Sequence, residues 1–234
     1  MALDVKQINQ DELSVNQYFK EDCSSLKKQV VIHFTAGNTS AVNTIGGWNQ
    51  NPERVGTAFV ISGKDKVEKD GQIHQAFGSK YWDYHLAFSK ASNNVPAKYH
   101  NFTHETEIAK ASIAIEICNW GGLTKAPDGS FRTYLNGIVH QDEVIELGTP
   151  YKGFKFYHAY TYNQLSSLRE LVVYLCDKYN IPKKFNSDMF DINTRALDGE
   201  AGIWTHTSYR SDKNDCSPQP NLISTLQSIN VKSI

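Results

Sequence analysis

The stretch of sequence that decides the fold is SIAIEIC, residues 112–118. Apolar residues alternate with small or polar ones along it, so that Ile113, Ile115 and Ile117 lie on one face of a β-strand. Glu116 lies on the other face, among small residues. Because a buried carboxylate is costly without a partner, this position indicates either a nearby cation or hydrogen-bond network, or an edge strand with one face in water.

The neighbouring segments predict further strands of an α/β protein. Residues 29–34 (QVVIHF) are rich in β-branched side chains and predict a buried strand with His33 at its end. Residues 57–62 and 72–77 flank a turn-rich stretch, which predicts an antiparallel hairpin with a long loop. Residues 119–160 are polar and rich in turns, and they predict a surface insertion of strands and loops.

Helices are expected in three places. Residues 40–50 predict a helix that two glycines weaken. Apolar residues recur at helical spacing over residues 165–179, behind the candidate cap Thr161, and this stripe suits the isoleucine face of residues 112–118. A proline opens a last helix over about residues 220–231. The expected fold is a single α/β domain with a mixed central β-sheet flanked by α-helices.

Composition narrows the classes of partner. The chain has 234 residues, 40% apolar and 21% charged, as in an ordinary globular domain. A net charge of −1 provides no broad basic field, so no nucleic acid is expected as a partner. The longest apolar run, residues 171–176, is far shorter than the ~20 residues that cross a bilayer, so no membrane insertion is expected. Residues 1–18 lack the apolar core of a secretory signal, and we expect synthesis in the cytoplasm without a signal peptide.

Candidate metal ligands stand far apart in the sequence. His33 ends a predicted strand, and His206 opens a polar segment that reaches Asp215 and Cys216. Two neutral imidazoles with one carboxylate or thiolate are typical of a catalytic zinc site, which keeps a position for water. From the residues alone, a structural histidine and a solvated loop remain the alternatives.

Several segments of the chain resemble one enzyme family. VVIHFTAG (residues 30–37), SIAIEICNWGG (112–122) and the late H-x6-K-x-D (206–215) are similar, in order, to the signature segments of the zinc-dependent N-acetylmuramoyl-L-alanine amidases of the type 2 class. This superfamily includes phage amidase endolysins and peptidoglycan recognition proteins. YWDYHLA (81–87) and the helical segment 160–182 are also similar to parts of the family.

The resemblance implies a hydrolase that cuts the amide bond between N-acetylmuramic acid and L-alanine in peptidoglycan or a soluble muropeptide. Residues 1–26 would form an N-terminal extension and residues 27–234 the amidase catalytic domain. A phage lysin, a bacterial remodelling enzyme and an exported effector all remain open, as do the route to the cell wall and the oligomeric state. The rival hypothesis is a peptidoglycan-binding recognition module without hydrolysis, and the presence of both Glu116 and Asp215 favours the enzyme.

The resemblance also implies a ligand set for Zn2+. His33 and His206 match the first two ligands, and Asp215 stands two residues after Lys213, as the third ligand does in the family. Cys216 departs from the family pattern at the next position, so a shift by one residue stays open. In an extended segment Lys213 and Asp215 project to the same side and Cys216 to the other, which favours Asp215.

The remaining roles come from the same resemblance. Glu116 matches the catalytic glutamate, which would take a proton from the attacking water and pass it to the leaving amine. Lys213 would face the oxyanion of the tetrahedral intermediate. Substrate contacts are expected from His85, Trp82 and Trp120.

Overall fold

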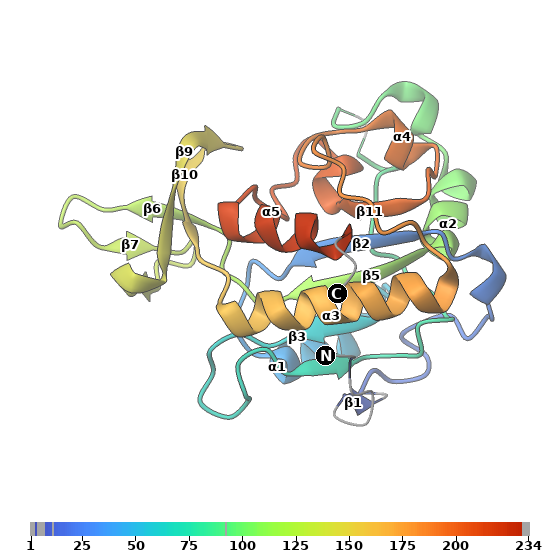
Figure 1. Ribbon diagram of the computed structural model, residues 1–234, viewed down its shortest axis with the longest axis horizontal. Coiled ribbons are helices and arrows are strands. Elements are labelled where there is room, and N and C mark those ends of the chain that lie inside the picture. Colours follow the sequence, from blue (N-terminus) through green and yellow to red (C-terminus); the bar gives the residue numbers. More distant parts are fainter. Residues whose placement is uncertain (1–2, 4–7, 11, 92, 231–234) are drawn as a thin grey trace.

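A six-stranded mixed sheet forms the centre of the computed structural model, which describes residue 3 and residues 8–10, 12–91 and 93–230. The strand order is β1-β4-β3-β5-β2-β11 (Figure 1). Strands β3 and β4 are antiparallel, and the other neighbours are parallel. The mixed central sheet is therefore confirmed. Its strands are β1 (Asn9–Gln10), β2 (Gln29–Phe34), β3 (Phe59–Ile61), β4 (Ile73–Gln75), β5 (Ser112–Ile117) and β11 (Gly202–Thr205).

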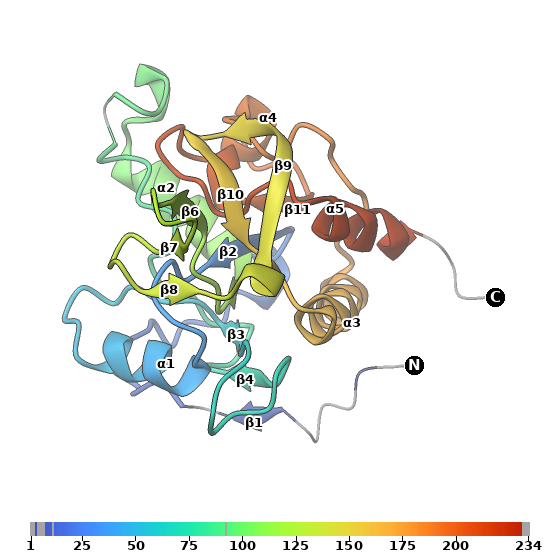
Figure 2. The same ribbon diagram turned by 90° about the vertical axis from the view of Figure 1, so that its left-hand side faces the viewer.

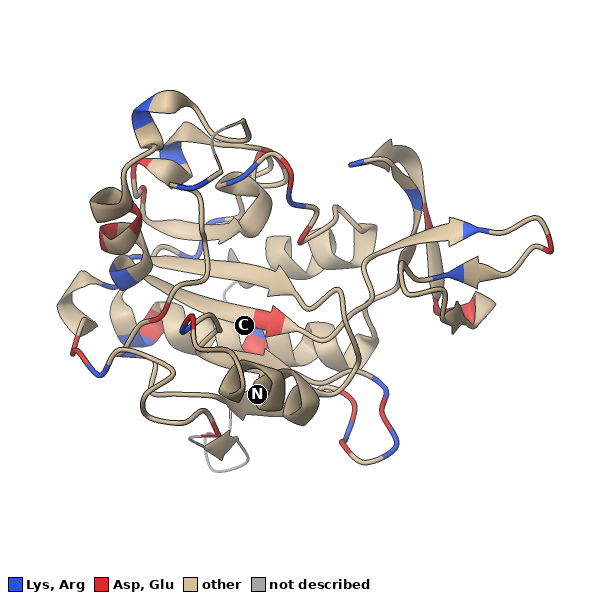
Figure 3. Ribbon diagram, turned by 180° about the vertical axis from the view of Figure 1, so that it is seen from behind, with Lys and Arg blue, Asp and Glu red and all other residues tan. Residues whose placement is uncertain are grey.

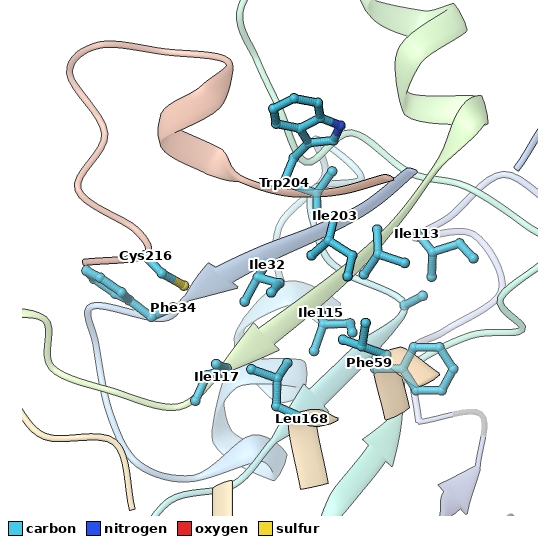
Figure 4. Close-up of a cluster of buried hydrophobic side chains, with 14 of the residues drawn as sticks. Ile32, Phe34, Phe59, Ile113, Ile115, Ile117, Leu168, Ile203, Trp204 and Cys216 are labelled. Atoms are coloured by element: carbon cyan, nitrogen blue, oxygen red, sulfur yellow. The ribbon is translucent and has the colours of Figure 1, made fainter. Parts of the chain in front are cut away.

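Strands β2 and β5 are neighbouring inner strands of this sheet, and every residue in both is buried. Ile32 and Ile115 belong to the main core cluster, together with Leu168 from the long helix behind the sheet (Figure 4). Parallel strands that are covered on both faces typically have sequences with unbroken runs of β-branched residues, and β2 has such a run. The edge-strand alternative for Glu116 is wrong, because β5 lies between β3 and β2 and Glu116 is only 8% exposed.

Helices cover both faces of the sheet. Helices α3 (Tyr162–Tyr179) and α5 (Pro220–Gln227) lie on one side, and α1 (Ala41–Asn49) lies on the other (Figure 2). A capping box between Thr161 and Gln164 starts α3, so the predicted cap is confirmed. A 3-10 turn follows α5, and the predicted helix end at residue 231 lies outside the described residues.

Helix α2 (Phe102–Ala111) is not predicted by the sequence pattern. It buries Ile108, Ala109 and Ala111, together with Glu105, so its apolar stripe is too weak to detect. None of the helices among the described residues is both long and apolar enough to cross a bilayer. The remaining helical segments are α4 (Thr194–Leu197) and the 3-10 turns η2 (Ser24–Leu26), η3 (Ala97–Tyr99), η4 (Gln141–Glu143), η5 (His206–Ser208) and η6 (Ser228–Asn230).

The predicted insertion forms a second, antiparallel sheet that projects from the main body (Figure 1). Its first strand begins at Gly122, shortly after the end of β5. A Cβ atom at Gly122 would lie 2.4 Å from Cγ of Phe154, so only glycine fits against this ring. Lys, Arg and Glu residues occur along the strands of this second sheet, whereas the described strands of the central sheet carry a single such charged residue, Glu116 (Figure 3). The strand order is β8-β7-β6-β10-β9, with β6 (Gly122–Lys125), β7 (Phe131–Arg132), β8 (Ile138–Val139), β9 (Val144–Tyr151) and β10 (Phe154–His158).

Candidate active site and metal centre

Three predicted ligands meet at the carboxyl ends of two neighbouring parallel strands. His33 lies near the end of β2, and His206 follows directly after β11, which pairs with β2. The Nδ1 atoms of the two histidines lie 3.1 Å apart. Asp215 Oδ2 lies 3.0 Å from His206 Nδ1 and 3.2 Å from His33 Nδ1. All three residues are buried, and they form the one group of potential metal ligands found among the described residues.

The tautomer of His206 shows what this arrangement can hold. Its Nε2 lies 3.0 Å from the carbonyl oxygen of Leu86, which can only accept a hydrogen bond, so Nε2 carries the proton. In the neutral ring, Nδ1 then carries no proton, and its lone pair faces the Asp215 carboxylate. Tetrahedral ligands about 2.0–2.1 Å from a zinc ion are separated by roughly 3.3 Å, close to the distances found here. The donor set therefore fits a divalent metal ion.

The ionisation states agree with this fit. Burial, and then the neighbouring His206, lower the pKa of His33 to about 4, which keeps its imidazole neutral near pH 7. Burial alone would raise the pKa of Asp215, but His206 and His33 outweigh it, so the net pKa is lowered and the carboxylate is ionised. Neutral imidazoles and an ionised carboxylate are the forms that bind metals.

Cys216 does not lie with these donor atoms. Its side chain is fully buried in the main apolar cluster, beside Phe34 (Figure 4). Burial, followed by the charge of Asp215, holds the pKa of the thiol well above its ordinary value, so it stays protonated. A protonated thiol is not a zinc ligand. The geometry thus brings Asp215, and not Cys216, to the two histidines.

Glu116 stands beside the ligands in the sheet. It pairs with His33 across β2 and β5, and paired residues of parallel strands point to the same face. Burial, and then the charge of Asp215, raise the pKa of Glu116 well above its usual range, while Lys213 acts in the opposite direction. A carboxyl group with a raised pKa can hold and release a proton near neutral pH.

A cleft of about 360 Å³ opens over these groups. Glu116, Lys213 and His85 all line it, as do the three ligands. Its other walls come from the end of β2 and the residues after it, from helix α1, from the segment before β3 and from the loop before Asp215. They are Phe34, Thr35, Ala36, Trp48, Val55, Gly56, Thr57, Asp212 and Asn214.

The three predicted substrate contacts lie in different surroundings. His85 is 8% exposed, and its Nδ1 lies 3.1 Å from Nε2 of His33, so it contacts a ligand. Trp82 is 5% exposed, stacks on Phe19 at 4.0 Å between ring centroids and donates its indole N–H to Glu21. The aromatic surface of Trp82 is therefore used in packing, and Trp82 is not among the residues that line the cleft.

Trp120 also lies outside the cleft lining, because it packs against Leu123, Phe131 and Val139 in the second sheet. Trp48 instead lines the cleft, from helix α1. Tertiary packing alone decides which of these two aromatic side chains reaches the cleft. The contact between the carbonyl oxygen of Leu86 and His206 is another feature of the site that no pattern of side chains reveals.

Two buried imidazoles and a carboxylate that could hold a metal ion, at a cleft with a second carboxyl group alongside, are typical of metal-dependent hydrolases. The family follows from the sequence: residues 25–220 match the profile of the N-acetylmuramoyl-L-alanine amidases (Amidase_2). The chain belongs to this family, which hydrolyses the amide bond between N-acetylmuramic acid and L-alanine. The predicted enzyme class is confirmed.

Solved structures are similar in fold. PlyL has a TM-score of 0.50 at 14% sequence identity, over 97% of this chain and 99% of PlyL. The Staphylococcus aureus hydrolase AmiA, solved in complex with its ligand, has a TM-score of 0.51 at 14% identity, over 98% of this chain and 83% of AmiA. A comparison with curated protein sequences found no significant match. At this level of identity the two structures support the fold only.

Proposed function

We propose that this amidase is a zinc enzyme in which His33, His206 and Asp215 hold the ion. The observation that carries the proposal is the convergence of three buried donor atoms, with 3.0–3.2 Å between them and Glu116 in register alongside. A zinc ion bound there would supply an activated water at neutral pH. Peptidoglycan or a soluble muropeptide is the proposed substrate, and the cell wall is the proposed place of action.

The residues of the chain would divide the proton and charge transfers between them. The Glu116 carboxylate would accept the proton of the attacking water and deliver it to the departing amine nitrogen, a role that typically contributes ~10²–10⁴-fold. Lys213 lines the same cleft, and its ammonium group would stabilise the negative charge that develops on the carbonyl oxygen. Glu116 is buried and Lys213 is partly buried, so water screens both interactions less than it would on an open surface.

Metal depletion and reconstitution test the proposal. The protein is stripped with a chelator, reloaded with zinc, and assayed for release of free stem peptide from intact sacculi and from soluble muropeptides. We expect release only after zinc is restored, at a stoichiometry near one ion per chain. The matched control is Glu116→Gln, which should bind zinc normally but release ~10²–10⁴-fold less peptide.

Two outcomes would contradict the proposal. Full activity in the stripped protein would remove the metal from the reaction. A protein that binds sacculi, takes up no zinc and releases no peptide would be a binding module, the rival hypothesis.

A further inference from the structure

We propose that His85 is a positioning residue, which holds His33 in the tautomer whose Nδ1 is free to bind a metal. This inference rests on the proposed function, because it concerns the same ligand set. This role explains the position of His85 without any contact with substrate, although His85 borders the cleft. Its neighbour Leu86 holds the second histidine in the same way.

A continuous row of hydrogen bonds leads away from the metal site through His85. His33 Nε2 lies 3.1 Å from His85 Nδ1, and His85 Nε2 lies 2.7 Å from Oγ of Ser112. The Ser112 hydroxyl in turn donates to the carbonyl oxygen of Ala109, at 3.2 Å. All three side chains in the row are buried, with exposures of 4%, 8% and 3% for His33, His85 and Ser112.

The last carbonyl sets the direction of the row. Because the Ala109 oxygen can only accept, it takes the one hydroxyl proton of Ser112, whose oxygen is left to accept from His85 Nε2–H. A neutral His85 then has a lone pair on Nδ1 and accepts from His33 Nε2–H. The remaining nitrogen of His33, Nδ1, carries no proton, and it is the atom that lies beside His206 and Asp215.

A buried lysine and the packing of the two rings hold the row in place. Lys27 lies beside the row, because its Nζ donates to the carbonyl oxygen of Ser112 at 2.7 Å. The rings of His33 and His85 meet edge to face, with 79° between their planes. That contact fixes the orientation of His33 as well as its tautomer.

The consecutive residues 85 and 86 therefore orient both imidazole ligands. His85 acts through its side chain on Nε2 of His33, and Leu86 acts through its carbonyl oxygen on Nε2 of His206. Partners of this kind commonly change metal affinity or activity by roughly 10- to 100-fold when they are removed. One short segment thus prepares both Nδ1 atoms for the same ion.

The test compares His85→Leu, which has no acceptor, with His85→Asn, whose Oδ1 takes the place of Nδ1. Nitrogen-15 NMR of the metal-free protein reports the tautomer of His33, and competition with a chelator gives the zinc dissociation constant. We expect the wild-type protein to show only the Nε2–H form of His33. His85→Leu should show a mixture of forms and weaker zinc binding by roughly 10- to 100-fold, and His85→Asn should recover most of both.

Two further variants keep the result interpretable. His158→Leu removes a histidine that is 7% exposed and lies outside the cleft lining, and it should change neither readout. If His85→Leu does not fold, Ser112→Ala breaks the next link while His85 stays in place, and it should weaken zinc binding by up to about tenfold.

Two results would overturn the inference. One is a wild-type His33 that carries its proton on Nδ1 in the metal-free protein. The other is a variant that leaves both the tautomer and the zinc affinity unchanged. Failure of the proposed function is a separate result, namely no zinc binding by the wild-type protein, and the tautomer measurement remains valid in that case.

Discussion

Replacing Asp215 by alanine should empty the metal site, whereas replacing Cys216 should not. Asp215 supplies one of the three protein donor atoms, 3.0 and 3.2 Å from the two imidazole nitrogens. Zinc sites are worth about 10–16 kcal/mol, so the loss of one ligand in three removes roughly 3–5 kcal/mol. That energy corresponds to a zinc dissociation constant at least ~100-fold larger.

Cys216→Ala changes the adjacent residue without touching a donor atom. The Cys216 side chain is fully buried in the apolar cluster, so its removal should lower the free energy of unfolding by about 1 kcal/mol. The zinc dissociation constant should stay within about twofold of the wild-type value.

Chelator competition on the two folded variants provides the comparison, with urea unfolding of each metal-free protein as a check on stability. The reverse outcome, in which Cys216→Ala loses zinc and Asp215→Ala keeps it, would refute the assignment. Equal losses in both variants would show that the segment acts through its backbone position and that neither side chain is the third ligand.

Other consequences of the structure can be measured separately. Gly122→Ala places a Cβ 2.4 Å from a ring carbon in β10 and should destabilise the fold by about 1–3 kcal/mol in urea unfolding, whereas Gly148→Ala, with no atom within 4 Å, should not. Burial lowers the pKa of Lys27 to about 8, so the folded state releases its proton before the unfolded state does. The stability of the wild-type protein relative to Lys27→Met should therefore rise by about 3 kcal/mol between pH 8 and pH 10.5, and a flat difference would contradict this. Trp48→Ala should raise KM up to about tenfold because Trp48 lines the cleft, and Trp82→Phe should leave KM unchanged; the opposite pattern would identify Trp82 as the substrate contact.

The central sheet follows from local pattern in the sequence. The alternation of Ile113, Ile115 and Ile117 predicts β5, and the capping residue Thr161 predicts the start of α3, because these signals depend on neighbours in the chain. Helix α2 is missed for the same reason, since its buried face is short and includes Glu105. Local pattern is informative only where one face of an element is clearly apolar.

The site is predictable in part, but from the resemblance to a family and not from local pattern. The positions of His33, His206 and Asp215 come from the resemblance to the family, and the structure brings these three residues together. The burial of Trp82 against Phe19 depends on how the N-terminal segment packs, which no short pattern reports. The contact from the Leu86 carbonyl to His206 joins residues 120 positions apart through a backbone atom, so residue type provides no signal for it.

Strand β11 closes one side of the six-stranded sheet, with β2 as its neighbour. Outer strands are commonly where a native protein opens locally, because they have fewer contacts than inner ones. An ion shared by His33 and His206 would join the ends of β2 and β11, and binding to the native form alone adds RT ln(1 + [L]/Kd) to its stability. Zinc would then protect the backbone amides of β11 from hydrogen exchange far more than those of β5, and the enzyme would resist fraying most strongly when it is ready to react.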